Sequence, residues 1–233
     1  MQALRIDVWS DIACPWCWVG KRHLEQAIEA AQRPVEVIWH AFELDPEAPV
    51  KQPEGRDYVQ RLADKYSLPK AQAQGMIDQM TERGAGVGLK FRFDRAQATN
   101  TFDAHRLLAW AKEQGRQNEL KEQLFLAYMN QGQLISDHDV LAQIAEQAGL
   151  DGEAAASLLA SEALTEHVRE DEATAHQLGV RGVPFFVFDQ RLGVSGAQPV
   201  SVLTEAILEA SAAESLPQGA DAEACGPEGC EIA

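Results

Sequence analysis

The segment ALRIDVWSDIACPWC, residues 3–17, decides the fold that we expect for this chain. Residues 3–9 are typical of a β-strand, whereas residues 14–31 repeat apolar side chains at helical spacing. Ser10 or Asp11 is expected to cap that helix. The two cysteines of the segment therefore fall at a strand-to-helix junction, which is typical of a redox centre.

The two cysteines are expected to have different roles. The start of a helix offers unpaired N–H groups and the positive end of the helix dipole, and both stabilise a thiolate on Cys14. Cys14 is therefore predicted to attack, and Cys17, one turn deeper, to resolve the mixed disulfide. The alternative is a structural zinc site completed by Cys225 and Cys230, although such sites prefer short paired knuckles.

The remainder of the chain predicts a helical middle between two β-containing ends. Residues 35–42 alternate and are β-branched, which predicts a second strand and a β-α-β opening. The later predicted elements are helices over 56–66 and 69–83, a flexible glycine-rich break at 84–88, mostly helices over 100–178, strands over 183–188 and 191–195, and a helix over 199–211. The two ends together are expected to form one small mixed sheet with flanking helices.

The composition excludes some classes of partner. The formal net charge is −16, from 20 Lys and Arg against 36 Asp and Glu. An acidic surface repels phosphates and anionic lipids, so we expect neither nucleic acid nor membrane partners. The N-terminal residues lack the basic and apolar regions of a signal peptide, so we expect a cytoplasmic protein. In a reducing compartment, closely spaced cysteines indicate catalysis or metal binding.

Val183 and Pro184 open the late strand and form a second candidate site. Proline at a strand start removes a backbone donor and is tolerated mainly at sheet edges. Only about 5–6% of X–Pro bonds are cis, so a trans bond is the commoner case. A cis Pro184 beside the thiols would present the backbone of Val183 to an extended peptide, and it would keep a metal ion off the cysteines.

Several motifs together resemble a known family. The CPWC motif at 14–17, the helical middle, and the GVPF motif at 182–185 resemble the thioredoxin fold and, more narrowly, the DsbA-like oxidoreductases. The stretches NTFDAHRL at 100–107 and VSGAQ at 194–198 are similar to patterns of the FrnE branch of that family. The resemblance covers about residues 3–211.

The element order together with the resemblance predicts an α/β thioredoxin fold with a mixed central sheet and an all-helical insertion. The residues from 212 onward are acidic and rich in Ala, Glu, Gly and Pro, which predicts a flexible C-terminal tail. The implied division is a thioredoxin-like domain in two parts, 1–43 and 166–211, a helical insertion over 44–165, and a tail over 212–233. It also implies that Pro184 is cis and faces Cys14. The implied activity is thiol–disulfide exchange on protein substrates, without a bound organic cofactor.

Two departures from DsbA modify this expectation. DsbA is periplasmic and has a histidine between its cysteines, whereas this chain has Trp16 there and no signal peptide. Reductase or isomerase behaviour is therefore favoured over strong oxidase behaviour. The expected partners are protein thiols and disulfides, with glutathione or a thioredoxin-type protein as the recycling partner.

Five residues are candidates for substrate binding: Pro15, Trp16, Val183, Asn100 and His105. Trp16 lies between the cysteines and is expected to be exposed and to touch substrate. Asn100 and His105 are expected to line a groove near Cys14, although Asn100 could simply cap a helix and a histidine on a helical face is more often structural.

The tail carries a second pair of thiols. Cys225 and Cys230 are separated by Gly-Pro-Glu-Gly, a turn-forming spacer that lets two thiols approach to disulfide distance. On a flexible tail, this pair could relay electrons between the CPWC centre and an external reductant or oxidant. The alternatives are a fortuitous disulfide and a weak metal clip.

Two other functions compete with a protein disulfide oxidoreductase. The first is a glutathione-dependent isomerase or transferase of the 2-hydroxychromene-2-carboxylate isomerase type. Those relatives carry serine at the position of Cys14, so the presence of both cysteines disfavours this function. The second is a redox-sensing, metal-binding protein whose tail docks or is released on oxidation.

Overall fold

The computed structural model describes residues 3–51 and 57–214. The elements are β1 (Leu4–Ser10), α1 (Pro15–Ala31), β2 (Val35–Ala41), α2 (Tyr58–Tyr66), α3 (Lys70–Gly86), α4 (Phe102–Glu113), α5 (Gln117–Leu126), a π-helical turn (Ala127–Gln131), α6 (His138–Gln147), α7 (Gly152–Leu159), α8 (Thr165–Gln177), β3 (Phe185–Phe188), β4 (Leu192–Ser195) and α9 (Val200–Glu214). This order confirms the predicted β-α-β opening, helical middle and β-β-α close.

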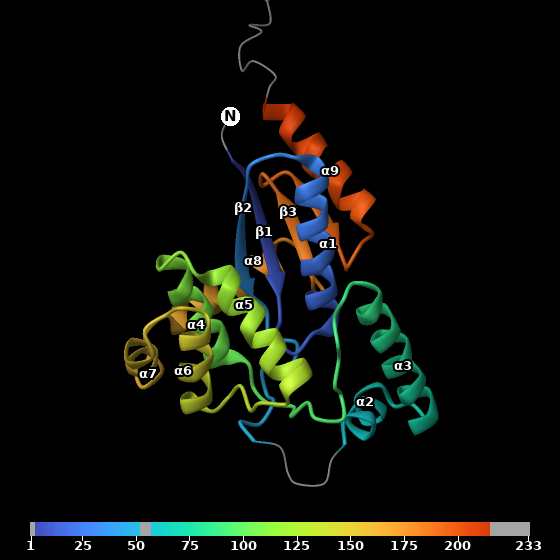
Figure 1. The fold of residues 1–233 in the computed structure, drawn as a ribbon, viewed down its shortest axis with the longest axis vertical. Coiled ribbons are helices and arrows are strands. Elements are labelled where there is room, and N and C mark those ends of the chain that lie inside the picture. Colours follow the sequence, from blue (N-terminus) through green and yellow to red (C-terminus); the bar gives the residue numbers. More distant parts are fainter. Residues whose placement is uncertain (1–2, 52–56, 215–233) are drawn as a thin grey trace, which may run out of the picture.

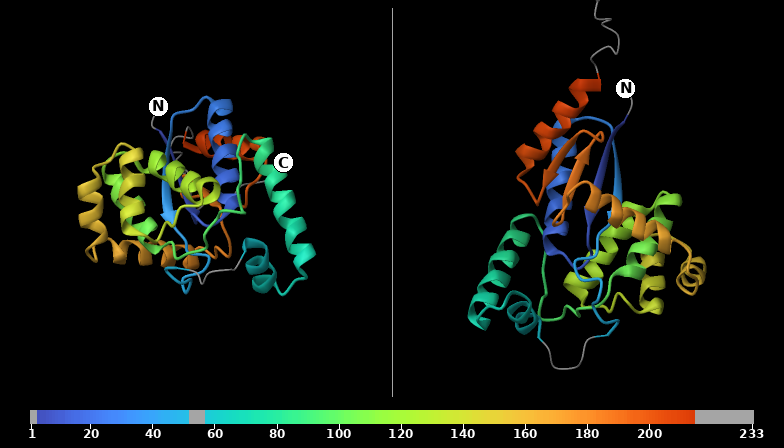
Figure 2. Two further views of the ribbon diagram at one scale, coloured as in Figure 1. Left: turned by 60° about the horizontal axis from the view of Figure 1, so that its bottom comes forward. Right: turned by 180° about the vertical axis from the view of Figure 1, so that it is seen from behind.

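The sheet is mixed, as the predicted fold class requires. Its strand order is β2-β1-β3-β4, with β1 parallel to β2, and with β3 antiparallel to both of its neighbours. Helices α1 and α9 lie side by side on one face of the sheet, and α8 lies on the other (Figure 1). The N-terminal end of α1 lies between the α2–α3 pair and the helices α4 to α7 (Figure 2).

Alternation along β1 explains why this strand is central. Leu4, Ile6 and Val8 point to the core beneath α1 and α9, where they meet Phe186 of β3. Trp9 points to the opposite face, toward α8. Both faces of β1 are therefore covered by helices. The loop that follows β1 leads to the N-terminal end of α1, next to the helical part of the molecule.

The predicted glycine-rich break at 84–88 is wrong in its first half, because α3 continues to Gly86. Gly84 lies within that helix, and a Cβ atom there would overlap the ring of Phe91. The glycine therefore serves close packing of Phe91 against α3, and not flexibility. The final helix also extends beyond its predicted end, since α9 continues to Glu214.

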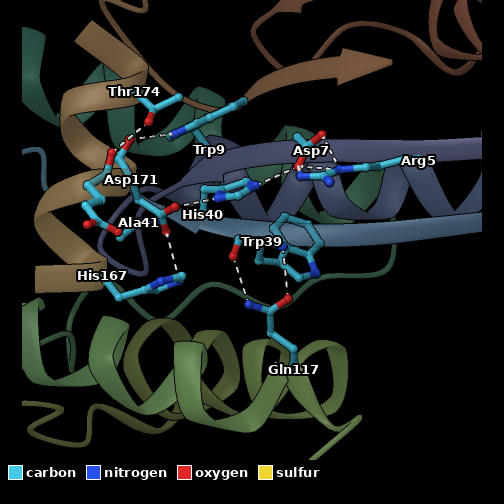
Figure 3. A network of polar contacts seen from close by, with 11 residues as sticks. Arg5, Asp7, Trp9, Trp39, His40, Ala41, Gln117, His167, Asp171 and Thr174 are labelled. Atoms are coloured by element: carbon cyan, nitrogen blue, oxygen red, sulfur yellow. Dashed lines mark hydrogen bonds and ion pairs between the residues drawn. The ribbon is translucent and has the colours of Figure 1, made fainter. Parts of the chain in front are cut away.

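A buried polar network ties α8 to the sheet (Figure 3). The His40 ring bonds the Asp7 carboxylate through Nε2 at 2.7 Å and the Asp171 carboxylate through Nδ1 at 2.6 Å. Asp171 also accepts the Ala41 N–H at 2.9 Å, and Trp9 stacks on His40 with ring centroids 4.6 Å apart. His40 of β2 links Asp7 of β1 to Asp171 of α8, and the Trp9 indole N–H of β1 donates to the Asp171 carbonyl oxygen at 2.9 Å. The network therefore fixes α8 against both strands.

We expect this network to make stability depend on pH. Burial works to lower the pKa of His40, but its hydrogen bonds to Asp171 and Asp7 outweigh burial and raise that pKa above the usual value. A raised histidine pKa contributes stability that is complete below the unfolded-state pKa and is lost as pH rises through the folded-state pKa.

The check is urea unfolding of the protein and of His40→Gln between about pH 6 and pH 9. The stability difference between the two proteins should shrink as pH rises. A difference that is the same at every pH would show that His40 is not held in its protonated form.

Within residues 3–51 and 57–214, no helix is both long and apolar enough to cross a membrane.

Candidate active site

Cys14 occupies the position just before α1, where its backbone is extended, and Pro15 is the first residue of the helix. The expected cap was wrong, since no side chain caps this helix start. Asp11 instead accepts the N–H groups of Ala13 at 3.3 Å and Leu44 at 2.9 Å. Pro15 has no N–H, and the Cys17 N–H donates to the Cys14 carbonyl oxygen at 3.0 Å. Stabilisation of a Cys14 thiolate by the helix start therefore stays a prediction from the helix dipole.

The two thiols differ in exposure. Both are free; Cys14 is 5% exposed and borders a pocket, whereas Cys17 has no exposed surface. Burial and the hydrogen bond to Cys14 raise the pKa of the Cys17 thiol well above its usual range. The geometry thus supports Cys14 as the thiol that an external disulfide can reach and Cys17 as the thiol behind it.

The late strand meets the motif through Val183 and Pro184. The Val183–Pro184 bond is cis, as the family resemblance implied. The Cys14 thiol donates to the carbonyl oxygen of Val183 at 3.5 Å. These two segments, far apart in sequence, therefore meet at one place.

Gly20 lets helix α1 approach Pro184 closely. A Cβ atom at Gly20 would lie 2.8 Å from Cγ of Pro184 and 3.3 Å from the ring of Phe186. The ring of Pro184 is closed onto its own backbone nitrogen, so it cannot withdraw without a shift of the backbone.

We therefore expect Gly20→Ala to push α1 away from Pro184. The variant should lose about 1–3 kcal/mol of stability, as is usual for an overpacked core, and should exchange disulfides more slowly. Urea unfolding and a thiol–disulfide exchange assay check both effects.

Gly75→Ala is the matched control for that substitution. Gly75 lies within α3, and a Cβ atom there would meet no other side chain or segment of the described residues within 4 Å. Because alanine favours helices over glycine by about 1 kcal/mol, the control should be neutral or stabilised. Equal destabilisation of the two variants would contradict the argument from contact with Pro184.

A pocket of about 150 Å³ opens beside Cys14. Helices α2 and α3 supply its apolar wall with Leu62, Met76 and Met80, and α2 adds Arg61 and Lys65. Asp11 and Asp45 line the same pocket, so its two cations are balanced by two carboxylates. The pocket therefore suits an apolar group that carries polar or charged ends of both signs.

The predicted substrate-binding residues do not all border this pocket. Pro15 and Trp16 do. The prediction of an exposed Trp16 is wrong, because its side chain is half-buried against the core, with the Arg83 guanidinium 5.9 Å from its ring centroid. Asn100 accepts the Phe102 N–H at 2.8 Å, but the N-cap of α4 is Thr101, and no side chain makes a cap bond at this helix start. The structure places Thr101, and not Asn100, on the pocket wall.

His105 is buried one side chain away from the pocket. Its Nε2 lies 3.4 Å from Oδ1 of Asp11, and Asp11 itself borders the pocket next to Cys14. Burial works to raise the pKa of Asp11, but the bonds to His105 and Leu44 outweigh it and lower that pKa. The structure thus makes Asp11 the charged group of this pair that faces the site.

Sequence reasoning missed Asp11, which it treated only as a cap, and also Lys121. Lys121 on α5 is fully buried, and its charge acts on Cys17 and Cys14. Its charge argued against burial, but it follows Leu120 and lies at helical spacing from Leu124 and Phe125, and this pattern could have placed it on the buried face of α5.

Cys225 and Cys230 lie outside the described residues. Within the described part of the chain, no group of three or more His, Cys, Asp or Glu side chains could hold a metal ion.

These features define the class of protein. The model of the DSBA-like thioredoxin domain family matches residues 5–208, and the chain belongs to this family. The family shares its fold with thiol–disulfide oxidoreductases, which agrees with the sequence-based expectation of a redox enzyme.

Two relatives are similar over nearly their full length. The crystal structure of a probable DsbA oxidoreductase, SCO1869 from Streptomyces coelicolor, is 40% identical with a TM-score of 0.86, and the match covers 99% of both chains. The uncharacterized protein YwbO of Bacillus subtilis is 31% identical over 88% of this chain and 96% of its own.

More distant structures share the fold alone. The cytosolic disulfide reductase DsbM from Pseudomonas aeruginosa, solved with GSH, is 20% identical with a TM-score of 0.62, over 90% of this chain and 100% of its own. A 2-hydroxychromene-2-carboxylate isomerase is 16% identical with a TM-score of 0.63, over 90% and 97% of the two chains. The fold is therefore compatible with both kinds of activity.

Proposed function

We propose that this protein exchanges thiols and disulfides in other proteins through Cys14 and Cys17. The observation that carries the proposal is the placement of the Cys14 sulfur. It lies at an uncapped helix start, 3.5 Å from the carbonyl oxygen of Val183, with an open pocket on one side and Cys17 behind it.

The reaction that this arrangement supports has two steps. The Cys14 thiolate attacks a substrate disulfide, forms a mixed disulfide and releases one substrate thiol. Cys17 then attacks the Cys14 sulfur, so that the second substrate sulfur leaves and a Cys14–Cys17 disulfide remains. The same steps in reverse oxidise a substrate, and incomplete cycles rearrange its disulfides.

Reduction of insulin disulfides with glutathione or dithiothreitol as electron donor tests this function. The protein should accelerate precipitation of the insulin chains above the rate of the donor alone. No acceleration at micromolar protein would contradict the proposal.

The finer assignments are also proposals. The NTFDAHRL and VSGAQ stretches support a place in the FrnE branch, and the acidic composition together with the N-terminal sequence supports a cytoplasmic location. Glutathione or a thioredoxin-type protein would recycle the CPWC centre, and Cys225 with Cys230 would relay the electrons. Loss of recycling by both donors in a Cys225→Ser/Cys230→Ser variant supports the relay, and unchanged recycling rejects it.

The pocket favours one second candidate, a glutathione-dependent isomerase or transferase. Arg61 and Lys65 line the pocket that Cys14 borders, and they could bind the carboxylates of glutathione, while Asp11 and Asp45 of the same lining could bind its ammonium group. The two functions differ in their need for Cys17, which only disulfide exchange requires. Glutathione binding by calorimetry with activity that survives Cys17→Ser would favour this candidate.

A further inference from the structure

Lys121 on α5 has no exposed surface, and within the described part of the chain its Nζ has no hydrogen-bond partner. Two aromatic rings lie near it, with Nζ 5.1 Å from the centroid of Phe125 and 5.6 Å from that of Trp39. Burying an unpaired charge costs several kcal/mol, so an unpaired buried lysine needs an explanation.

The helix that carries Lys121 packs against the start of α1. Trp18, the residue after Cys17, stacks on Phe125 with ring centroids 5.8 Å apart, and Phe125 lies one turn after Lys121. The positive charge of Lys121 acts on the Cys17 sulfur and favours its thiolate form. Burial lowers the pKa of Lys121 to about 8, and Cys17 is the strongest of the groups that oppose this.

The neighbouring buried lysine shows that burial alone does not leave a lysine unpaired. Lys21 on α1 is 2% exposed, yet its Nζ bonds Glu25 and lies 3.0 Å from the Glu122 carboxylate. Lys121, by contrast, has no carboxylate in bonding contact within the described residues. The groups whose charge favours its ammonium form are Cys17, then Asp11 and Cys14, and of these the two thiols become anions only during the reaction.

We infer that Lys121 is a positioning residue that supplies the counter-charge for the Cys17 thiolate during disulfide exchange. This inference rests on the proposed function. In the resolving step, Cys17 forms a bond to the Cys14 sulfur while the bond between Cys14 and the substrate sulfur breaks. The substrate sulfur leaves with the electron pair and takes up the proton that Cys17 gave up. The cysteine pair is oxidised and the substrate is reduced.

In the reverse direction, Cys17 is the leaving group. A substrate thiolate attacks the Cys14 sulfur of the disulfide, and Cys17 departs as a thiolate beside the Lys121 ammonium. The ammonium therefore lowers the cost of the same buried anion in both directions.

The other charged and titratable groups that face Lys121 come from three elements. They are Asp11 in the loop after β1, Cys14, Cys17 and Lys21 at α1, and His105 on α4. Asp11 favours the ammonium form and Lys21 opposes it.

The test follows reaction with an aromatic disulfide whose thiolate product is coloured. Attack by Cys14 releases the first thiolate, and attack by Cys17 on the resulting mixed disulfide releases the second. In Lys121→Met, the second phase should be about 10-fold slower or more at pH 7, equivalent to a shift of about one pKa unit in Cys17. The pH midpoint of the second phase should rise by the same one unit. The rate of the first phase should change by less than about 3-fold, because the first phase depends on Cys14 and the proposed role of Lys121 concerns Cys17.

Three variants complete the design. Lys121→Arg should restore most of the second-phase rate, because it keeps the charge. Lys21→Met removes a buried lysine that is already paired, so the second-phase midpoint should remain near that of the unaltered protein. If Lys121→Met does not fold, Lys121→Gln is measured with the same expected result.

Stability separates this role from a structural one. Removing an unpaired buried charge should leave the urea midpoint unchanged or raise it, so Lys121→Met should be slower yet no less stable. A folded variant with an unaltered second phase and pH midpoint would overturn the inference and leave the proposed function intact. If the unaltered protein releases only the first thiolate, the proposed function itself fails.

Discussion

Cys14→Ser is expected to lower disulfide exchange activity by roughly 100-fold or more, because it removes the only nucleophile of the motif that borders the pocket. The serine side chain is nearly the same size, and the site is 5% exposed. The fold should therefore remain intact, so that loss of activity reports chemistry and not unfolding. Insulin reduction and circular dichroism on the same preparation check both parts.

Cys17→Ser is the matched variant, because it alters the second thiol of the same motif. It should leave the first attack possible but block resolution, so a covalent complex between Cys14 and the substrate should accumulate. Intact mass spectrometry after quenching with acid detects this adduct. Full activity of Cys14→Ser, or adducts through Cys17 in place of Cys14, would contradict the assigned roles.

Asp171→Ala is expected to lower the free energy of unfolding by about 3 kcal/mol, in the range found when one partner of a buried ion pair is removed. The substitution leaves the His40 ring and the Ala41 N–H without the carboxylate that each now bonds. Because these bonds join α8 to β2, their removal should weaken the packing of α8 against the sheet. Urea unfolding followed by tryptophan fluorescence measures it.

Glu170→Ala is the control for that prediction. Glu170 precedes Asp171 on α8 and its side chain is exposed. An exposed substitution of this kind usually changes stability by less than about 0.5 kcal/mol. A loss below about 1 kcal/mol in Asp171→Ala would show that the network in Figure 3 contributes little to holding α8.

Local patterns were sufficient to predict the order of elements and the fold class. The alternation in β1 and the helical spacing that follows it directly reflect which faces are buried. The exceptions have physical reasons. Gly84 suggested a break, but its lack of a side chain instead lets the Phe91 ring pack against α3.

The candidate site was predictable only where the chemistry lies within a motif. Cys14 and Cys17 are close in sequence, and the position of Val183 beside them followed from the family resemblance. Asp11 and Lys121 depend on tertiary packing. Lys121 lies at helical spacing with the apolar residues of α5, but only the packing of α5 against α1 and β2 shows that a lysine is buried there.

The central claim, that Cys14 and Cys17 form a reversible redox pair, is tested most directly by titration in glutathione buffers. The protein is equilibrated at each potential, its thiols are alkylated, and the fragments that carry residues 14 and 17 are separated by mass from those that carry 225 and 230. The account predicts that Cys14 and Cys17 lose their labels together, in one transition that fits a two-electron couple. Labelling of both thiols at every potential, or labelling that requires a chelator, would contradict it.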